Sequence, residues 1–99
     1  MAINSIHDQV SRFLARKFGL EYYPDKGADD RGRIVIEVET DPRKISEAKQ
    51  QLQGYAKPRY IAGTNKKTVE AALASTEGTK IGVMDKDGRI LRQAKRPSR

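Results

Sequence analysis

The chain has 99 residues, enough for one compact domain, and its 20 lysines and arginines against 13 acidic residues give a net charge of +7. The absence of cysteine excludes a disulfide scaffold, a thiolate metal site and a cysteine nucleophile. No apolar run approaches the ~18 residues of a membrane span, and the N-terminus lacks a signal-peptide core. The expectation is a cytoplasmic (intracellular) protein with no membrane partner.

The excess of positive charge predicts a polyanionic partner. Nucleic acid is the first candidate, because contacts to phosphate dominate its binding, and an anionic membrane surface is the second. Against both stands the fact that many small proteins are basic without a specific partner. A domain of this size also has a thin stability margin, which dimerisation or a bound metal would improve.

The first predicted element is a helix over Ser5–Phe18, where apolar residues recur at three- and four-residue spacing. Asp8 lies three residues after the first residue of this helix, as in a capping box, and Gly19 suits the helix C-terminus. A short strand is expected over Leu20–Tyr23, followed by a polar stretch whose end, Asp29–Gly32, predicts a turn.

Residues 33–40 form the clearest predicted strand, because its side chains alternate between two faces. One face is apolar and carries Ile34, Ile36 and Val38. The other face carries Val35, Glu37 and Glu39. Because Val35 is apolar, we expect this second face to point at least partly inward, with both carboxylates on it.

Two carboxylates in a semi-buried site repel each other and are costly unless a cation neutralises them or one takes a proton. Hard oxygen ligands of this kind suit Mg²⁺ or Mn²⁺. The Glu37 and Glu39 pair therefore predicts a metal site. The alternative is an exposed strand face that carries two solvated acids.

The next predicted helix begins at Asp41 and Pro42 and runs to Ala56, since aspartate is a good N-cap and proline is favoured at the first helical position. Pro58 ends this helix. A brief strand is expected over Tyr60–Gly63.

Asn65 is expected to cap a third helix over Lys66–Ser75, which Gly78 ends. Lys66 and Lys67 lie at the start of this helix, where backbone amides and positive charge suit an anion. Both lysines are therefore candidate nucleic-acid contacts.

A C-terminal β-hairpin is predicted from Ile81–Met84 and Arg89–Leu91, because Asp87-Gly88 is typical of a two-residue turn. Residues 92–99 hold four basic residues and no acid, and they predict a flexible basic tail in which Lys95 and Arg96 contact nucleic acid. The predicted fold is α/β (α+β), a mixed sheet flanked by helices, in a single domain over residues 1–91.

Two motifs resemble those of a known family. Pro24-Asp25, eleven intervening residues and then Glu37-Val38-Glu39 resemble the signature of the PD-(D/E)xK (restriction-endonuclease-like) nuclease superfamily. Residues 48–56 contain a Gln-Leu-x-x-Tyr-Ala sequence similar to the pattern that often follows this signature. The resemblance covers about residues 5–63, and a hairpin before the signature strand could bring Asp25 beside Glu37.

The resemblance implies a restriction-endonuclease-like core and metal-dependent hydrolysis of phosphodiester bonds, in DNA more than in RNA, by a homodimer. Asp25 and Glu37 would hold Mg²⁺ (or Mn²⁺), with Glu39 on a second ion or accepting a proton. Gln51 and Tyr55 are four residues apart and share a face of the predicted second helix, and Lys44 lies two turns before Gln51 on that face. By the resemblance, Gln51 and Tyr55 would support the site or contact the substrate.

One departure from the family concerns the signature lysine, whose position holds Glu39. Lys44 on the following helix is the best-placed replacement, and Lys49 is less well placed. Lys49 and Tyr55 are also candidate contacts to nucleic acid. Asp29 or Asp30 would substitute as a ligand if the Pro24-Asp25 match arose by chance. Two other functions stay open: a non-catalytic nucleic-acid-binding module on the same fold, and an adaptor whose acidic face binds a partner protein.

Overall fold

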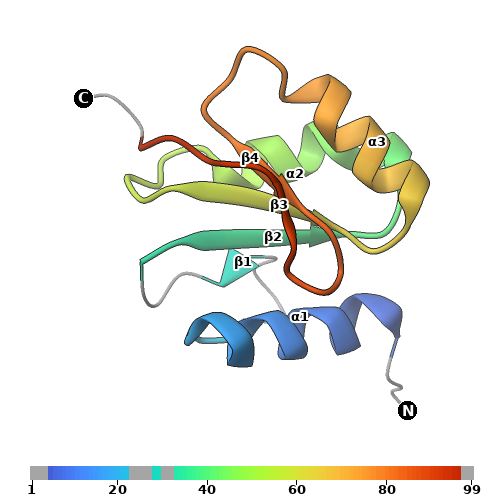
Figure 1. Ribbon diagram of the computed structural model, residues 1–99, viewed down its shortest axis with the longest axis vertical. Coiled ribbons are helices and arrows are strands. Elements are labelled where there is room, and N and C mark those ends of the chain that lie inside the picture. The colour runs from blue at the N-terminus through green and yellow to red at the C-terminus, as the bar shows by residue number, and fades with distance from the viewer. Residues whose placement is uncertain (1–4, 23–27, 30–32, 97–99) are drawn as a thin grey trace.

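The computed structural model describes residues 5–22, 28–29 and 33–96 (Figure 1). In these ranges, five strands form one sheet in the order β1-β2-β3-β4-β5. The strands are β1 (Ala28–Asp29), β2 (Val35–Glu39), β3 (Arg59–Gly63), β4 (Gly82–Met84) and β5 (Ile90–Arg92). The helices are α1 (Ile6–Phe18), α2 (Ile45–Leu52), α3 (Lys66–Ser75) and the short 3₁₀ helix η1 (Pro42–Lys44).

The sheet is mixed, as the sequence predicts. Strands β2, β3 and β4 are parallel to one another. Strand β1 pairs antiparallel with β2, and β5 pairs antiparallel with β4. Helix α2 connects β2 to β3, and α3 connects β3 to β4. Both helices cover one face of the sheet, and α1 covers the other (Figure 1). The fold is therefore α+β with three layers.

Each face of the sheet has its own apolar cluster. The cluster under α2 and α3 consists of Val35, Ile45, Ala48, Leu52, Ile61, Ala72, Ile81 and Val83. The cluster under α1 consists of Val10, Leu14, Ile36, Val38, Tyr60, Ala62 and Met84. Successive residues of β2 alternate between the two clusters, which confirms the predicted pattern of that strand.

The two ends of α1 confirm the sequence prediction. The Ser5 hydroxyl accepts a hydrogen bond from the Asp8 backbone N–H at 3.1 Å. Gly19 ends the helix with φ of 68°, a left-handed conformation that glycine adopts without steric cost. Within the described ranges, none of the helices combines the length and the apolar character needed to span a bilayer.

The strand expected over Leu20–Tyr23 is wrong for residues 20–22, which are irregular. The Leu20 backbone N–H donates to the Ala15 carbonyl at 2.8 Å, so it helps to close α1. The Tyr22 hydroxyl then donates to Asp8, which holds this segment against α1 rather than in the sheet. The first strand lies instead at Ala28–Asp29, inside the stretch whose end was expected to be a turn. Tyr23 and residues 30–32 lie outside the described residues.

The second helix is shorter than the predicted Pro42–Ala56. It begins as η1, becomes α-helical at Ile45 and ends at Leu52. Gln53 is extended, with ψ of 143°, and Gly54 has φ of 93°. The backbone freedom of glycine therefore ends the helix before Tyr55, which is not helical and packs against the cluster under α2 and α3.

The C-terminal hairpin is present, but its turn differs from the two-residue turn expected. The Asp85 N–H donates to the Arg89 carbonyl at 3.0 Å, so three residues separate the pair. Gly88, the last of the three, has φ of 83°. The Asp85 carboxylate accepts from the N–H groups of Asp87 and Arg89 at 2.9 and 3.0 Å, which favours the longer turn.

The predicted tail began at Arg92, but the sheet continues to that residue. Its guanidinium donates to the Leu73 carbonyl at 2.9 Å and the Thr76 hydroxyl at 2.7 Å, at the end of α3. The Lys95 N–H donates to the Lys80 carbonyl at 2.9 Å. Residues 92–96 therefore lie alongside β4 and the residues just before it. Residues 97–99 lie outside the described residues.

Leu52 is fully buried in the cluster under α2 and α3, whereas Leu91 is 46% exposed on the sheet edge. We expect Leu52→Ala to lower the free energy of unfolding by about 2–5 kcal/mol, because it removes buried methyl groups and leaves a cavity. Leu91→Ala, the matched control, should change it by less than about 1 kcal/mol. Urea unfolding followed by circular dichroism measures both, and equal losses would contradict this description of the core.

Candidate functional site

Glu37 lies at the centre of β2, and its side chain is 7% exposed. It lies on the same face of the strand as Val35, which is fully buried under α2. In the sheet, its register partners are Ala28 of β1 and Ile61 of β3. The prediction of an inward-pointing carboxylate is therefore confirmed for Glu37, and the alternative of a solvated acid is wrong for this residue.

The buried position of Glu37 raises the question of how its carboxylate is stabilised. An ionised carboxylate removed from water costs several kcal/mol unless hydrogen bonds or an opposite charge offset the loss. Strand β2 also runs between two apolar clusters. A hard divalent cation, hydrogen bonds to the carboxylate and a bound proton are the three ways to meet this cost.

Glu39 is half-buried at the end of β2, and its role is partly structural. Its Oε2 accepts hydrogen bonds from the backbone N–H groups of Thr40 and Asp41, both at 2.9 Å. These bonds turn the chain from β2 into η1. The Oε1 atom accepts no hydrogen bond from a described residue, so one of the two carboxylate oxygens is left for another role.

Asp41 begins η1 as predicted, since its Oδ1 accepts from the Arg43 N–H at 2.9 Å. The Arg43 guanidinium also binds this carboxylate through Nε and Nη2, each at 3.1 Å. Together the side-chain and backbone hydrogen bonds of Arg43 hold the pKa of Asp41 below its usual value of 3.8. The ionised Asp41 carboxylate thus caps η1, directly after the strand that carries Glu37 and Glu39.

Hydrogen bonds join the ends of β2 and β3 to the start of α3. The Thr40 carbonyl accepts from Asn65 Nδ2 at 3.0 Å and from the Thr68 hydroxyl at 3.1 Å. Asn65 also caps α3, as predicted, by accepting from the Thr68 N–H at 2.9 Å. The Thr64 N–H donates to the Glu39 carbonyl at 3.1 Å. The backbone on both sides of the Glu39 side chain is therefore fixed.

Only part of the predicted ligand set lies among the described residues. Asp25 and Asp30 lie outside them, and the backbone of Asp29 pairs with Ile36 rather than with Glu37. The described residues contain no group of three or more acidic or histidine side chains that could hold a metal ion. Among the described residues, the predicted carboxylate ligands are thus reduced to Glu37 and Glu39, on one face of β2.

The other predicted catalytic residues, Lys44 and Gln51, are exposed. Lys44 ends η1 and Gln51 lies near the end of α2, so the expected two-turn spacing crosses a change of helix type. The expected helical pairing of Gln51 with Tyr55 is wrong, because α2 ends at Leu52. Lys49 is half-buried and donates to the Ser75 carbonyl at 3.1 Å, which ties α2 to the end of α3.

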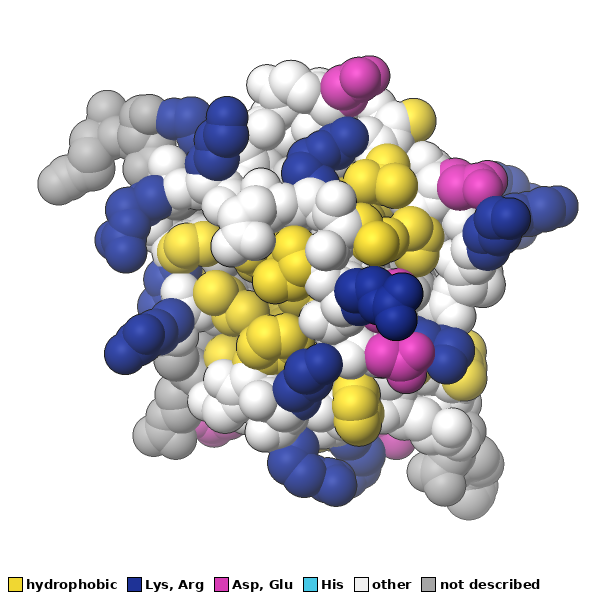
Figure 2. Space-filling view, in the orientation of Figure 1, with side chains coloured by type: hydrophobic (Ala, Val, Ile, Leu, Met, Phe, Trp, Pro, Cys, Tyr) yellow, Lys and Arg dark blue, Asp and Glu magenta, His cyan; other side chains and the backbone are white. Residues whose placement is uncertain are grey.

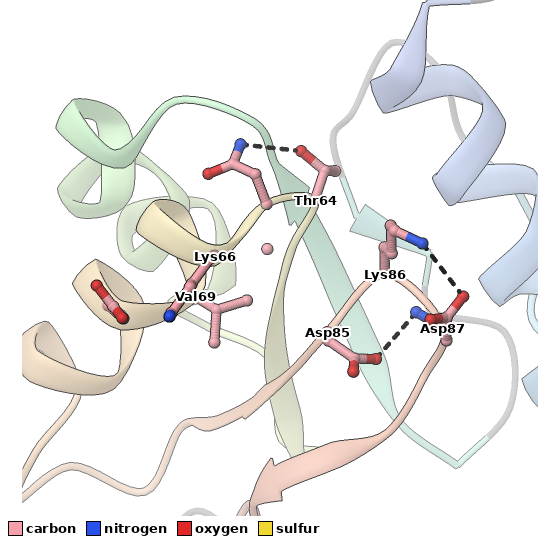
Figure 3. A pocket seen from close by; sticks show the side chains of 9 residues that line it. Thr64, Lys66, Val69, Asp85, Lys86 and Asp87 are labelled. Carbon is pink, nitrogen blue, oxygen red and sulfur yellow. Dashed lines mark hydrogen bonds and ion pairs between the residues drawn. The ribbon is translucent and has the colours of Figure 1, made fainter.

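A cavity of about 360 Å³ that sequence reasoning missed lies beyond the carboxyl ends of β3 and β4 (Figure 3). Its lining residues are Gly63, Thr64, Asn65, Lys66, Val69, Glu70 and Asp85–Asp87. Cations and acids share this lining, so the cavity has mixed charge. The chain order of Asn65-Lys66 and Asp85-Lys86-Asp87 carries no sign that the two segments meet.

The predicted nucleic-acid contacts fall into three places. Lys66 and Lys67 are exposed at the start of α3, and Lys66 borders the mixed cavity. Lys95 and Arg96 are exposed after β5, near the ends where the parallel strands begin, whereas α3 starts where β3 ends. Lys49 and Tyr55 are half-buried, near α2. The structure therefore does not gather these residues into one surface.

Comparisons with models of known protein families, with curated proteins and with solved structures found no match.

The contact between Arg43 and Asp41 gives a pH prediction. In Arg43→Ala we expect the pKa of Asp41 to rise, but to stay below 3.8 because the backbone N–H at position 43 still binds the carboxylate. Since the folded pKa is depressed, the stabilisation by this cap is present above pH 3.8 and is lost as the pH falls through the folded pKa. Carboxyl ¹³C NMR titration measures the shift; the same rise in Arg89→Ala would contradict the assignment.

Proposed function

We propose that this protein is a metal-dependent nuclease related to the PD-(D/E)xK superfamily, which hydrolyses phosphodiester bonds in DNA. The observation that carries the proposal is the burial of the Glu37 carboxylate at the centre of β2. Glu37 is also the residue that the sequence resemblance identifies as a metal ligand. A buried carboxylate on a central strand supports the proposal, because metal ligands are held on rigid elements away from bulk water.

The order of elements supports the proposal. Helix α1 precedes an antiparallel pair, β1 and β2, and is followed by α2 and the parallel strand β3. This is the order that the resemblance implies for the conserved core of the superfamily. The elements from α3 to β5 extend the same sheet by two strands.

The residues present fit a hard cation in part. Glu37 offers a buried carboxylate, and Glu39 offers Oε1 on the same strand face. Asp25 is the proposed additional ligand. When bound, Mg²⁺ or Mn²⁺ lowers the pKa of a water molecule and polarises a phosphoryl oxygen. Lys44, exposed on the segment after β2, is the proposed source of positive charge near the reacting phosphate.

A non-catalytic nucleic-acid-binding module is the second candidate function, and a specific observation favours it. The position of the signature lysine is occupied by Glu39, one of whose carboxylate oxygens binds two backbone N–H groups. That role is structural and supplies no proton transfer. In this alternative, Glu37 and Glu39 bind a cation, or stabilise the fold, without cleavage of the nucleic acid.

Glu37→Gln tests the proposal, because it keeps the size of the side chain and removes its charge. We expect metal-dependent cleavage of DNA to fall at least about 100-fold, since even the loss of an outer-shell partner costs 10–100-fold. Binding to DNA in EDTA should persist, as it depends on phosphate contacts elsewhere. Asp25→Ala should behave in the same way.

Glu47→Gln is the matched control, because Glu47 is exposed in the first turn of α2. The assay uses linear, supercoiled, branched and single-stranded DNA, and RNA, with Mg²⁺, Mn²⁺ or EDTA. Undiminished cleavage in both Glu37→Gln and Asp25→Ala would rule out this site. Salt-sensitive binding of the wild-type protein with no cleavage of any substrate would favour the binding module.

A further inference from the structure

The fold brings together four basic segments that are far apart in the sequence. The parallel strands β2, β3 and β4 begin at one edge of the sheet, and the antiparallel strand β5 ends there. The Val35 N–H donates to the Pro58 carbonyl at 3.0 Å, and the Lys95 N–H donates to the Lys80 carbonyl at 2.9 Å. These contacts place residues 33–34, 57–59, 80–81 and 92–96 side by side. We call this surface the amino edge.

The amino edge is strongly basic. Its cations, besides Arg92, are Arg33, Lys57, Arg59, Lys80, Lys95 and Arg96. The four segments contain no acidic residue. Figure 2 shows lysine and arginine side chains gathered along the left margin of the molecule, on the side where β2 and β3 begin in Figure 1.

The opposite edge of the sheet has mixed charge. It carries Glu39 at the end of β2, Asp41 after that strand, and Asp85 and Asp87 after β4. Two of its cations form ion pairs with these acids: Arg43 pairs with Asp41, and Lys86 pairs with Asp87 at 3.6 Å. The net positive charge of the described chain is thus concentrated at the amino edge.

Several cations of the amino edge are available to an external anion. Arg33, Lys95 and Arg96 are exposed. None of the three forms an ion pair within the described part of the chain. Their charges are therefore not neutralised by the protein there, and phosphate groups are the ligands that match such a surface.

We infer that the amino edge is the surface that binds the phosphate backbone of DNA. This inference rests on the proposed function, whose cleavage site it supplies with substrate. Arg33 lies four residues before Glu37 and two before the start of β2, so the two residues are at most roughly 13 Å apart along the chain. That distance is less than half of the ~34 Å helical turn of DNA, so one duplex can contact the amino edge while its backbone reaches the level of Glu37.

The test compares two variants that remove the same charge. The first is the triple substitution Arg33→Ala, Lys95→Ala and Arg96→Ala, at exposed positions of the amino edge. The matched control is Arg43→Ala, Lys86→Ala and Arg89→Ala, at exposed positions of the opposite edge. The dissociation constant for a fluorescent 30-base-pair DNA is measured in EDTA over a series of salt concentrations, after thermal melting has shown that each variant is folded.

We expect the amino-edge variant to bind on the order of 100-fold more weakly at 0.15 M salt, and the slope of log K against log salt to decrease by about 2–3, since each phosphate contact contributes ~0.9. The control should keep the wild-type slope. Equal weakening in both variants, a larger loss in the control, or no binding of DNA by the wild-type protein would overturn the inference. So would salt-sensitive binding to anionic vesicles but not to DNA.

These outcomes are separable from the fate of the proposed nuclease activity. Binding through the amino edge without cleavage would support this inference and contradict the nuclease proposal. Cleavage that needs Glu37, together with wild-type binding by the amino-edge variant, would do the reverse.

Discussion

Strand β2 lies between two apolar clusters, and the residue at its centre is a glutamate. Val35 packs under α2, while Ile36 and Val38 pack under α1. Both faces of this strand are therefore buried. The alternation that builds the two clusters also places the Glu37 carboxylate inside the molecule. A hydrophobic residue of similar size would satisfy the packing, so the glutamate needs a chemical explanation.

Hydrogen bonds hold the carboxyl end of β2 in addition to the packing of its apolar side chains. Glu39 binds the next two backbone N–H groups, and Thr40 accepts hydrogen bonds from Asn65 and Thr68 of the α3 start. A site on such a strand is held by rigid elements rather than by a loop, which is the arrangement that metal and substrate positioning need. The amino edge lies at the other end of the same strands, and in our proposal it binds the rest of a polyanionic substrate.

Sequence patterns were sufficient wherever a local rule and a packing requirement agreed. Alternation predicted β2, and Ser5 and Asn65 predicted the starts of α1 and α3, because cap hydrogen bonds are made within four residues. Predictions failed where one residue changed the backbone. Gly54 ended α2 early, and the Asp85 carboxylate favoured a longer hairpin turn.

Features built from distant segments could not be predicted in this way. The amino edge joins residues 33–34, 57–59, 80–81 and 92–96, and only strand direction and register bring them together. The mixed cavity between the start of α3 and the β4–β5 turn is of the same kind. Of the candidate metal ligands, the strand pattern correctly gave the face and the burial of Glu37, because both follow from period-two alternation.

We propose that the buried Glu37 carboxylate binds a divalent cation, and thermal melting in the presence of Mg²⁺ or Mn²⁺ measures this binding without any substrate. A ligand that binds only the folded state stabilises it by about 2.7 kcal/mol at 100 times its Kd. We expect millimolar Mg²⁺ or Mn²⁺ to raise the Tm of the wild-type protein by several degrees and to leave that of Glu37→Gln unchanged. A Tm that does not respond to either metal, or that rises equally in both proteins, would contradict it.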